Sequence, residues 1–200
     1  VVNDNQMSIA ENHGGMYKNL KLLRDTKGKA ECNFFKTFGF DYLYVEDGNN
    51  VPALISAFEK VKNIKHPTVV HINTVKGKGY KFAEEDKERF HAGGPFDLET
   101  GQPKTTYSEE NYSDLTAKYL LEKMEKDKTI VAISSATPSV LGFNPERRKL
   151  AGRQFVDVGI AEEHAVAMAS AIARNGCKPV YGVFSTFIQR TYDQLSQDLC

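Results

Sequence analysis

The chain has 200 residues, enough for one large domain or two small ones, and 40% hydrophobic and 26% charged residues, which is ordinary for a globular protein. Its 26 basic residues balance 26 acidic ones, so the net charge gives no reason to expect binding to nucleic acid or to an anionic membrane surface. Cys32, Cys177 and Cys200 are too few and too far apart for a disulfide framework or a zinc site, which favours the reducing cytoplasm, and no apolar run approaches the ~20 residues of a membrane span.

The first part of the chain alternates between the helical and the strand period, which is the rhythm of βαβ units. The expected elements are a strand from residue 1, helices at 16–24 and 31–37, a strand at 42–45, a helix at 52–62 and a strand at 68–72. Pro52 suits a first helical turn, where its missing N–H is not needed. From residue 76 to 103 the pattern gives way to glycine, proline and charge, which predicts a long loop that is either functional or a linker.

The second part repeats the alternation. We expect a helix at 108–126 with Leu115, Tyr119 and Met124 near one face, a strand at 129–133, a helix at 145–150, a strand at 155–158, a helix from Glu162 to Asn175, a strand at 178–183 and a helix from Ser185. Strand-to-helix junctions of this kind place polar residues at one end of a parallel sheet, where open α/β folds bind ligands. The predicted fold class is therefore α/β, with mostly parallel sheets and flanking helices.

Two oxygen donors follow the first strand. The side-chain oxygen of Asn5 and the backbone carbonyl of Met7 are spaced to bind one hard divalent cation such as Mg²⁺, with phosphate oxygens at other positions. On these residues alone, an Asn-rich turn that ends a strand is the commoner explanation.

The glycine-rich segment carries three candidate groups. Lys76 and Lys78 stand between glycines and could hold a phosphate, although a solvated basic loop is the commoner outcome. His91 is a candidate acid or base only if it reaches a pocket.

The junction around Glu162 has several interpretations. Glu162 can simply favour the dipole of the helix that it begins, an effect of up to about 1 kcal/mol, and Glu163 and His164 compete with it for any chemical role. Phe187 would ordinarily belong to a core, and Arg190 would ordinarily be an exposed helical charge.

Taken together, the motifs resemble those of the 1-deoxy-D-xylulose-5-phosphate synthases, thiamine-diphosphate enzymes of the transketolase superfamily. Residues 3–9 resemble NDNEMSI, 45–48 resemble VDG, 76–80 with His91 resemble KG(R/K)GY and FHA, 155–166 resemble FDVAIAEQHAV, and 184–194 resemble YSTFLQRAYDQ. The matches run in family order over most of the chain.

The resemblance implies a cofactor and its ligands. Asn5 and Met7 would bind the Mg²⁺ that holds the diphosphate of thiamine diphosphate. Glu162 would hydrogen-bond the aminopyrimidine and favour the tautomer that activates the thiazolium. Phe187 would stack on the pyrimidine, and Ile160 would support the bent cofactor.

The resemblance also implies the reaction. Pyruvate and glyceraldehyde 3-phosphate would condense with loss of CO₂ to 1-deoxy-D-xylulose 5-phosphate, a precursor of isoprenoids, thiamine and pyridoxal. His91 would donate a proton or contact a substrate, and Arg190 would bind the phosphate of the aldehyde. The full-length protein would be a cytoplasmic homodimer.

In domain terms, the resemblance assigns residues 1–91 to the C-terminal part of a diphosphate-binding domain, 92–107 to a linker and 108–200 to the N-terminal part of a pyrimidine-binding domain. The chain lacks an initiator Met and the family's Gly-Asp-Gly motif, and it ends within an amphipathic helix. We therefore expect a central fragment that is inactive by itself.

Some residues depart from the family pattern. The connection from Met7 to Phe34 is shorter than in the family, which suggests a compact variant. Phe184 replaces a tyrosine and Asn49 a histidine, so the sequence does not determine which acceptor substrate the protein uses. The alternatives are a transketolase-like ketol transferase and a non-catalytic structural or interaction module.

Overall fold

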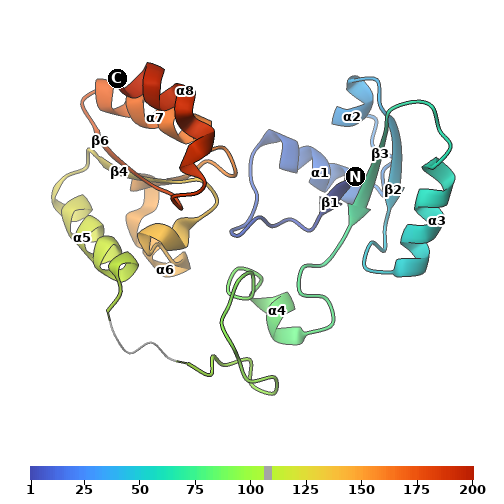
Figure 1. Cartoon of the computed structure of the whole chain (residues 1–200), viewed down its shortest axis with the longest axis horizontal. Coiled ribbons are helices and arrows are strands. Elements are labelled where there is room, and N and C mark those ends of the chain that lie inside the picture. Colours follow the sequence, from blue (N-terminus) through green and yellow to red (C-terminus); the bar gives the residue numbers. More distant parts are fainter. Residues whose placement is uncertain (106–109) are drawn as a thin grey trace. The chain divides into compact units, whose positions relative to one another are not determined.

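A computed structural model describes residues 1–105 and 110–200, and Figure 1 shows their helices and strands. The chain divides into two compact units, Val1–Lys104 and Thr105–Cys200, each with its own parallel sheet. The start predicted at Ser108 for the first helix of the second unit lies outside the described residues.

The first unit is built on three parallel strands in the order β1-β3-β2. Its elements are β1 (Val2–Asp4), α1 (Gly15–Asp25), α2 (Phe34–Thr37), β2 (Asp41–Val45), α3 (Val51–Val61), β3 (Thr68–Asn73) and α4 (Lys81–Glu85). Helices cover both faces of the sheet (Figure 1), because apolar side chains of the strands point to each face in turn. One face packs on α1 and α2 through Leu20, Leu23 and Phe35, and the other packs Val70 and Ile72 with α3.

Local capping sets the helix starts in this unit. Pro52 lies in the first turn of α3 as predicted, and the side chain of Asn50 accepts a hydrogen bond from the backbone N–H of Ala53 at 3.2 Å. The side chain of Asn33 accepts from the backbone N–H of Phe35 at 3.0 Å, and its own backbone is extended. The helix predicted at 31–37 therefore begins only at Phe34, so the prediction was wrong for its first three residues.

The segment predicted as a long loop is compact. It contains α4 and a cluster of four aromatic rings, in which Tyr80 lies 5.6 Å from Phe82, 5.7 Å from Phe90 and 5.5 Å from Phe96, centroid to centroid. The hydroxyl of Tyr80 donates to the carbonyl of Leu98 at 3.1 Å. Ring packing of this kind buries apolar area without a regular period, which is why the hydrophobic pattern did not predict it.

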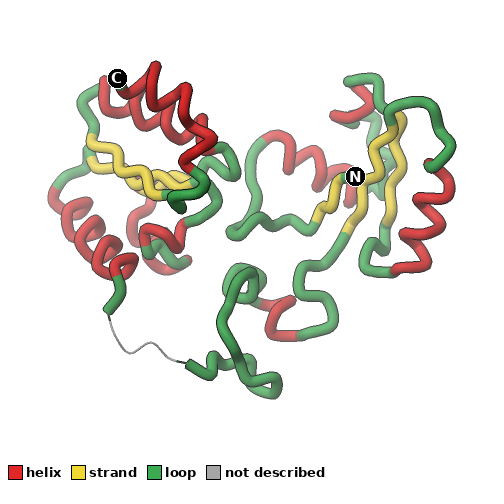
Figure 2. The backbone as a smooth tube through the Cα atoms, viewed as in Figure 1, coloured by secondary structure: helices red, strands yellow, loops and turns green. Residues whose placement is uncertain are grey.

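The second unit has three parallel strands in the order β5-β4-β6. Its elements are α5 (Tyr112–Lys126), β4 (Ile130–Ser134), η1 (Pro138–Leu141), α6 (Pro145–Ala151), η2 (Gly152–Gln154), β5 (Phe155–Asp157), α7 (Glu162–Arg174), β6 (Lys178–Gly182), η3 (Ile188–Thr191), α8 (Tyr192–Gln194) and η4 (Leu195–Leu199). Figure 2 distinguishes the strands of each sheet from the surrounding helices. The predicted α/β class with parallel sheets and flanking helices is confirmed.

The core of the second unit lies between the sheet and α5. Helix α5 buries Ala117, Leu120 and Met124, and Phe143 and Phe155 stack with their ring centroids 5.0 Å apart. The predicted face was wrong for Leu115 and Tyr119, which are 44% and 60% exposed. The buried residues recur at intervals of three and four, which matches one helical face better than the predicted spacing.

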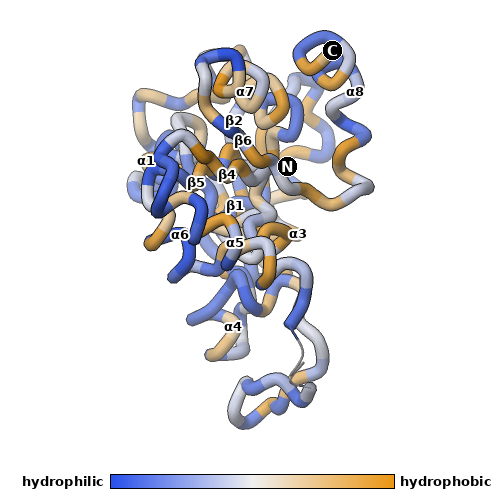
Figure 3. The backbone as a smooth tube through the Cα atoms, turned by 90° about the vertical axis from the view of Figure 1, so that its left-hand side faces the viewer, coloured by the Kyte–Doolittle hydropathy of each residue, from blue (hydrophilic) through white to orange (hydrophobic). Residues whose placement is uncertain are grey.

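The remaining boundaries agree with the sequence except at the C-terminal helix. Helix α7 ends at Arg174, and Gly176 follows with a left-handed φ of 83°, as the Asn-Gly pair predicted. The helix predicted from Ser185 begins at Ile188 and starts as a 3-10 turn. Figure 3 shows hydrophobic residues along β4 and β6 and hydrophilic residues along α1. Among the described residues, no helix is both long and apolar enough to cross a membrane.

Candidate active site

One carboxylate organises the carboxyl edge of the second sheet. Strand β5 ends at Asp157, whose Oδ1 accepts hydrogen bonds from the backbone N–H groups of Ala136 at 2.9 Å and Gly159 at 2.8 Å. The loops that follow β4 and β5 are thereby joined at a single atom. Sequence reasoning did not single out Asp157, although an Asp that ends a strand two residues before a glycine is typical of such a turn.

Glu162 is the first residue of α7 and is 3% exposed. Its Oε2 lies 3.4 Å from a terminal nitrogen of the Arg190 guanidinium, a side chain that is 57% exposed. The amino end of the helix also favours a negative charge. The next two residues, Glu163 and His164, are exposed, so Glu162 is the carboxylate that the fold turns inward.

Apolar side chains accompany this carboxylate. Phe187 is 39% exposed, and its ring meets that of Phe184 edge to face, with centroids 5.6 Å apart. The carbonyl of Phe187 accepts from the backbone N–H of Arg190 at 3.2 Å, so the ring and the cation belong to one turn. Ile160 is 59% exposed and lies two residues before Glu162. The second unit therefore offers a buried carboxylate, a cation and exposed apolar side chains on neighbouring segments.

A hydroxyl pair lies in the same unit. The side-chain oxygens of Ser135 and Tyr181 are 2.9 Å apart. Burial raises the pKa of Tyr181, the hydrogen bond to Ser135 opposes this, and the negative charges of Glu162 and Glu163 raise it further. The phenol consequently keeps its proton. Sequence reasoning missed the pair, because Ser135 and Tyr181 are 46 positions apart in the chain.

In the first unit, the chain turns sharply after β1. The side-chain oxygen of Asn5 accepts from the backbone N–H of Met7 at 2.9 Å, and Gln6 between them has a left-handed φ of 67°. The carbonyl-type oxygens of Asn5 and Met7 suit Mg²⁺ in kind, since this ion takes hard oxygen ligands and keeps several waters or phosphate oxygens. They would fill only part of its shell. No group of three or more His, Cys, Asp or Glu among the described residues could hold a metal by itself.

Lys76 connects this turn to His91. Its ammonium donates to the carbonyl of Ser8 at 2.7 Å and lies 2.8 Å from Nδ1 of His91. His91 is exposed, yet partial desolvation lowers the pKa of its imidazole, and the positive charge of Lys76 lowers it further. Lys78 is exposed, so the prediction of a solvated basic loop suits Lys78 and was wrong for Lys76.

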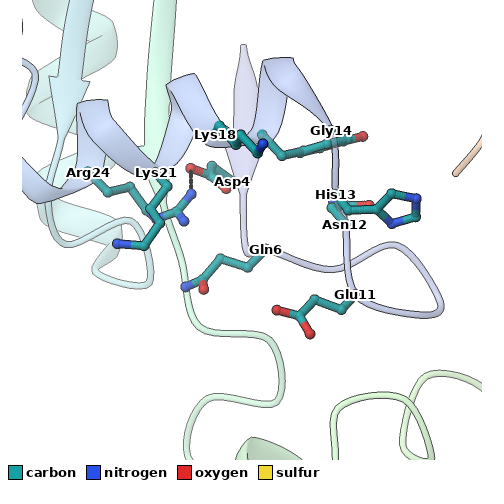
Figure 4. Close-up of a pocket in the computed structure, with 10 residues that line it drawn as sticks. Asp4, Gln6, Glu11, Asn12, His13, Gly14, Lys18, Lys21 and Arg24 are labelled. Carbon is teal, nitrogen blue, oxygen red and sulfur yellow. Dashed lines mark hydrogen bonds and ion pairs between the residues drawn. The ribbon is translucent and has the colours of Figure 1, made fainter. Parts of the chain in front are cut away.

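Beside the same turn lies a pocket of about 300 Å³. Figure 4 shows Gln6 and Glu11 on its loop side and Lys18, Lys21 and Arg24 on the side of α1. The lining mixes both signs of charge, and the sequence analysis did not predict it.

Two residues that line the pocket, Asp4 and Arg24, belong to a buried polar network. Asp4, which is 4% exposed, pairs with Arg24 and accepts from Nε2 of the fully buried His71 at 2.8 Å. The hydroxyl of Tyr42 lies 2.6 Å from the other ring nitrogen of His71. Because an ionised carboxylate only accepts, Nε2 of His71 carries its hydrogen toward Asp4.

The predicted site residues thus fall into two local groups. Asn5, Met7 and His91 belong to the first unit, where Lys76 links His91 to the residue after Met7. The members of the second group, Ile160, Glu162, Phe187 and Arg190, belong to the second unit.

Comparison with known proteins gives two matching family models. The model described as "Transketolase, pyrimidine binding domain" matches residues 109–200, which include the second group. The model described as "1-deoxy-D-xylulose-5-phosphate synthase" matches residues 22–74.

Curated relatives named 1-deoxy-D-xylulose-5-phosphate synthase match the chain from end to end. The protein of Caldanaerobacter subterraneus subsp. tengcongensis is 38% identical over 236 residues, covering 100% of this chain and 38% of the relative. That of Clostridium acetobutylicum is 38% identical over 239 residues, with the same coverages. That of Listeria monocytogenes serotype 4b is 41% identical over 209 residues, covering 100% of this chain and 34% of the relative.

The chain therefore spans little more than a third of the length of the curated relatives that it matches. The alignments with the first two relatives are longer than the 200 residues of this chain, so those proteins have additional residues within the matched region. The two family models and the identity along the whole chain show that it belongs to the 1-deoxy-D-xylulose-5-phosphate synthase family.

Proposed function

We propose that the protein is a transferase of the transketolase type, which condenses pyruvate with glyceraldehyde 3-phosphate to 1-deoxy-D-xylulose 5-phosphate with loss of CO₂. The observation that carries this proposal is the buried carboxylate of Glu162 on the first turn of α7, in the part matched by the pyrimidine-binding family model. A carboxylate held dry at a helix start can bind a ring N–H strongly, because it has little water to compete with it.

The residues of the second unit fit the pyrimidine end of thiamine diphosphate. Glu162 would accept a hydrogen bond from the ring nitrogen, and the exposed ring of Phe187 would offer a stacking face. Ile160 would support the cofactor with its exposed side chain. Bound thiamine diphosphate would supply the stabilised carbanion that amino acid side chains lack.

The residues of the first unit fit the other end of the cofactor. Asn5 and Met7 would supply two oxygens to Mg²⁺, with the diphosphate and water completing the shell. We assign residues 1–91 to the diphosphate-binding domain, 92–107 to a linker and 108–200 to the pyrimidine-binding domain, on the family resemblance.

Two further side chains are assigned to the substrates. Arg190 would turn from Glu162 to the phosphate of the aldehyde, a move that its 57% exposed side chain permits. His91 would donate a hydrogen bond or a proton to a substrate oxygen. We also propose a cytoplasmic homodimer for the full-length protein, on the resemblance alone, which light scattering and cell fractionation test.

The role of Glu162 is tested by Glu162→Gln, which keeps the shape of the side chain and removes its charge. In the protein as the cell makes it, we expect cofactor affinity and thiamine-dependent CO₂ release from pyruvate to fall by at least tenfold. Glu163→Gln is the matched control, because Glu163 is the exposed neighbour in the same turn. Equal activity in the two variants would refute the assignment.

The substrate assignment needs a separate assay. CO₂ release from pyruvate that requires glyceraldehyde 3-phosphate would support the proposed reaction. Transfer of a two-carbon unit from xylulose 5-phosphate would overturn it in favour of a transketolase-like enzyme, and absence of thiamine diphosphate binding would favour a non-catalytic module.

A further inference from the structure

Three segments of the first unit meet at one ammonium group. Lys76 lies on the loop after β3, Ser8 on the loop after β1 and His91 beyond α4. Nζ of Lys76 is 2.7 Å from the carbonyl oxygen of Ser8 and 2.8 Å from Nδ1 of His91. Both distances are those of strong hydrogen bonds.

The chemistry of the three groups fixes the direction of both bonds. A lysine ammonium has three N–H donors and no acceptor, and a carbonyl oxygen only accepts. Nδ1 of His91 therefore meets the ammonium with its lone pair, and the hydrogen of the imidazole must then sit on Nε2. We propose that Lys76 is a positioning residue that holds His91 as the Nε2–H tautomer and so presents a hydrogen-bond donor on the side of the ring away from Lys76.

The surroundings of His91 limit its freedom to escape this arrangement. The backbone N–H of His91 donates to the carbonyl of Glu88 at 3.2 Å. The ring of the preceding Phe90 packs against Tyr80 and against Phe96, with centroids 5.7 Å and 5.0 Å apart. The aromatic cluster thus holds the backbone at His91 in place, and the contact with Lys76 sets the orientation of the imidazole.

Nearby charges also affect the pKa values of His91 and Lys76. His91 is exposed, but partial desolvation and the positive charge of Lys76 lower the pKa of its imidazole, which favours the neutral form. Burial lowers the pKa of Lys76, Glu88 opposes that effect and Lys87 adds to it. A neutral imidazole with a fixed hydrogen can donate from Nε2 without carrying a charge.

The role of this donor in turnover rests on the proposed function. A donor at Nε2 would polarise a substrate carbonyl or return a proton to a substrate oxygen. The opposite tautomer would meet that oxygen with a lone pair and repel it. The state of His91 itself does not depend on any reaction.

The test is long-range ¹H–¹⁵N NMR of the histidine side chains in the full 200-residue chain. The chain has five histidines, and His91→Gln assigns the signal of interest. We expect Nδ1 of His91 to show the nitrogen shift of an unprotonated acceptor and Nε2 that of a protonated nitrogen, with a titration midpoint below the ordinary value of about 6.5. A hydrogen on Nδ1 in the unmodified chain would overturn the proposal without any variant.

Variants at the two neighbouring lysines separate positioning from general structure. Lys76→Met should mix the tautomers and raise the His91 midpoint only in part, because desolvation, the larger cause of the lowered pKa, remains. Lys76→Arg should retain the signature because guanidinium also only donates. Lys78→Met is the matched control and should change nothing, since Lys78 is exposed on the same loop. An unchanged His91 signature in Lys76→Met would refute the role of Lys76. Because the readout needs no turnover, its failure is distinguishable from failure of the proposed reaction.

Discussion

Arg24→Met tests whether the buried network beneath α1 holds the first unit together. The Arg24 side chain is 14% exposed and that of its partner Asp4 is 2% exposed, so the substitution leaves a buried carboxylate without its cation. Breaking a buried ion pair from one side typically costs about 3–5 kcal/mol. Asp4 keeps the hydrogen bond from His71 at 2.8 Å, and we therefore expect the lower end of that range, about 3 kcal/mol.

The matched control is Lys21→Met on the same helix. Lys21 pairs with Asp25, but the two side chains are 66% and 57% exposed, and exposed pairs contribute about 1 kcal/mol or less. Hydrogen exchange of the β3 amides in the full chain reports on the first unit alone. Each loss of 1.4 kcal/mol in the free energy of unfolding speeds exchange about tenfold, so Arg24→Met should speed the exchange of the β3 amides on the order of 100-fold and Lys21→Met less than about tenfold.

Equal exchange in the two variants would show that the buried pair contributes no more than a surface pair, and would refute the reasoning. The double variant Asp4→Asn with Arg24→Met supplies a second check. It removes the uncompensated charge, so it should exchange more slowly than Arg24→Met alone.

Three further predictions concern stability. Phe143→Ala should destabilise the second unit by about 3–5 kcal/mol in urea denaturation, because the side chain is fully buried, whereas Leu150→Ala, at 76% exposed, should cost about 0.5 kcal/mol or less. Gly142→Ala should lower the melting temperature more than Gly176→Ala. Both glycines have a positive φ, but an added Cβ at Gly142 would lie 2.1 Å from a backbone oxygen of α5, whereas one at Gly176 would meet no atom within 4 Å. Burial alone would raise the pKa of Asp4, but hydrogen bonds from His71 and Arg24 outweigh burial and lower that pKa. The stability that Asp4 contributes is therefore present above pH ~3.9 and is lost as the pH falls through the lowered pKa. Asp4→Asn should therefore flatten the acid limb of the stability profile, and an unchanged limb would contradict this.

Regular periodicity explains which elements could be predicted from the sequence. The strands were predicted from short continuous apolar runs, which stay covered along β3 and β4, and α7 from apolar residues at intervals of three and four. The family resemblance selected Glu162 from the acidic pair, and Glu162, Ala165 and Val166 form the buried face of α7. Features that break the period were missed. The aromatic cluster around Tyr80 and the start of α2 at Phe34 depend on particular side-chain contacts that a regular hydrophobic period does not predict.

Long-range polar pairs were beyond sequence reasoning for a different reason. Asp4 and His71 are 67 positions apart, so their pairing depends on how the strands order in the first sheet. Glu162 and Arg190, by contrast, follow two successive strands and were expected at the same end of the second sheet, where they lie 3.4 Å apart. A single sequence predicts a parallel sheet from βαβ rhythm but does not fix which strand is central. The polar network therefore becomes visible only when the order β1-β3-β2 is known.

The two buried carboxylates differ in a way that separates a structural role from a binding role. Asp4 is held by both Arg24 and His71, and the Arg24 side chain is itself largely buried. Among the described residues, Glu162 is paired with Arg190 at 3.4 Å, near the limit of a hydrogen bond, and that guanidinium is mostly in solvent. A loose contact to a solvated cation contributes little, so exchanging Arg190 for a ligand N–H at Glu162 costs little, whereas displacing Arg24 from Asp4 would strand a charge in the core. The same reasoning that makes Asp4 a stabilising residue thus supports the proposed binding role of Glu162.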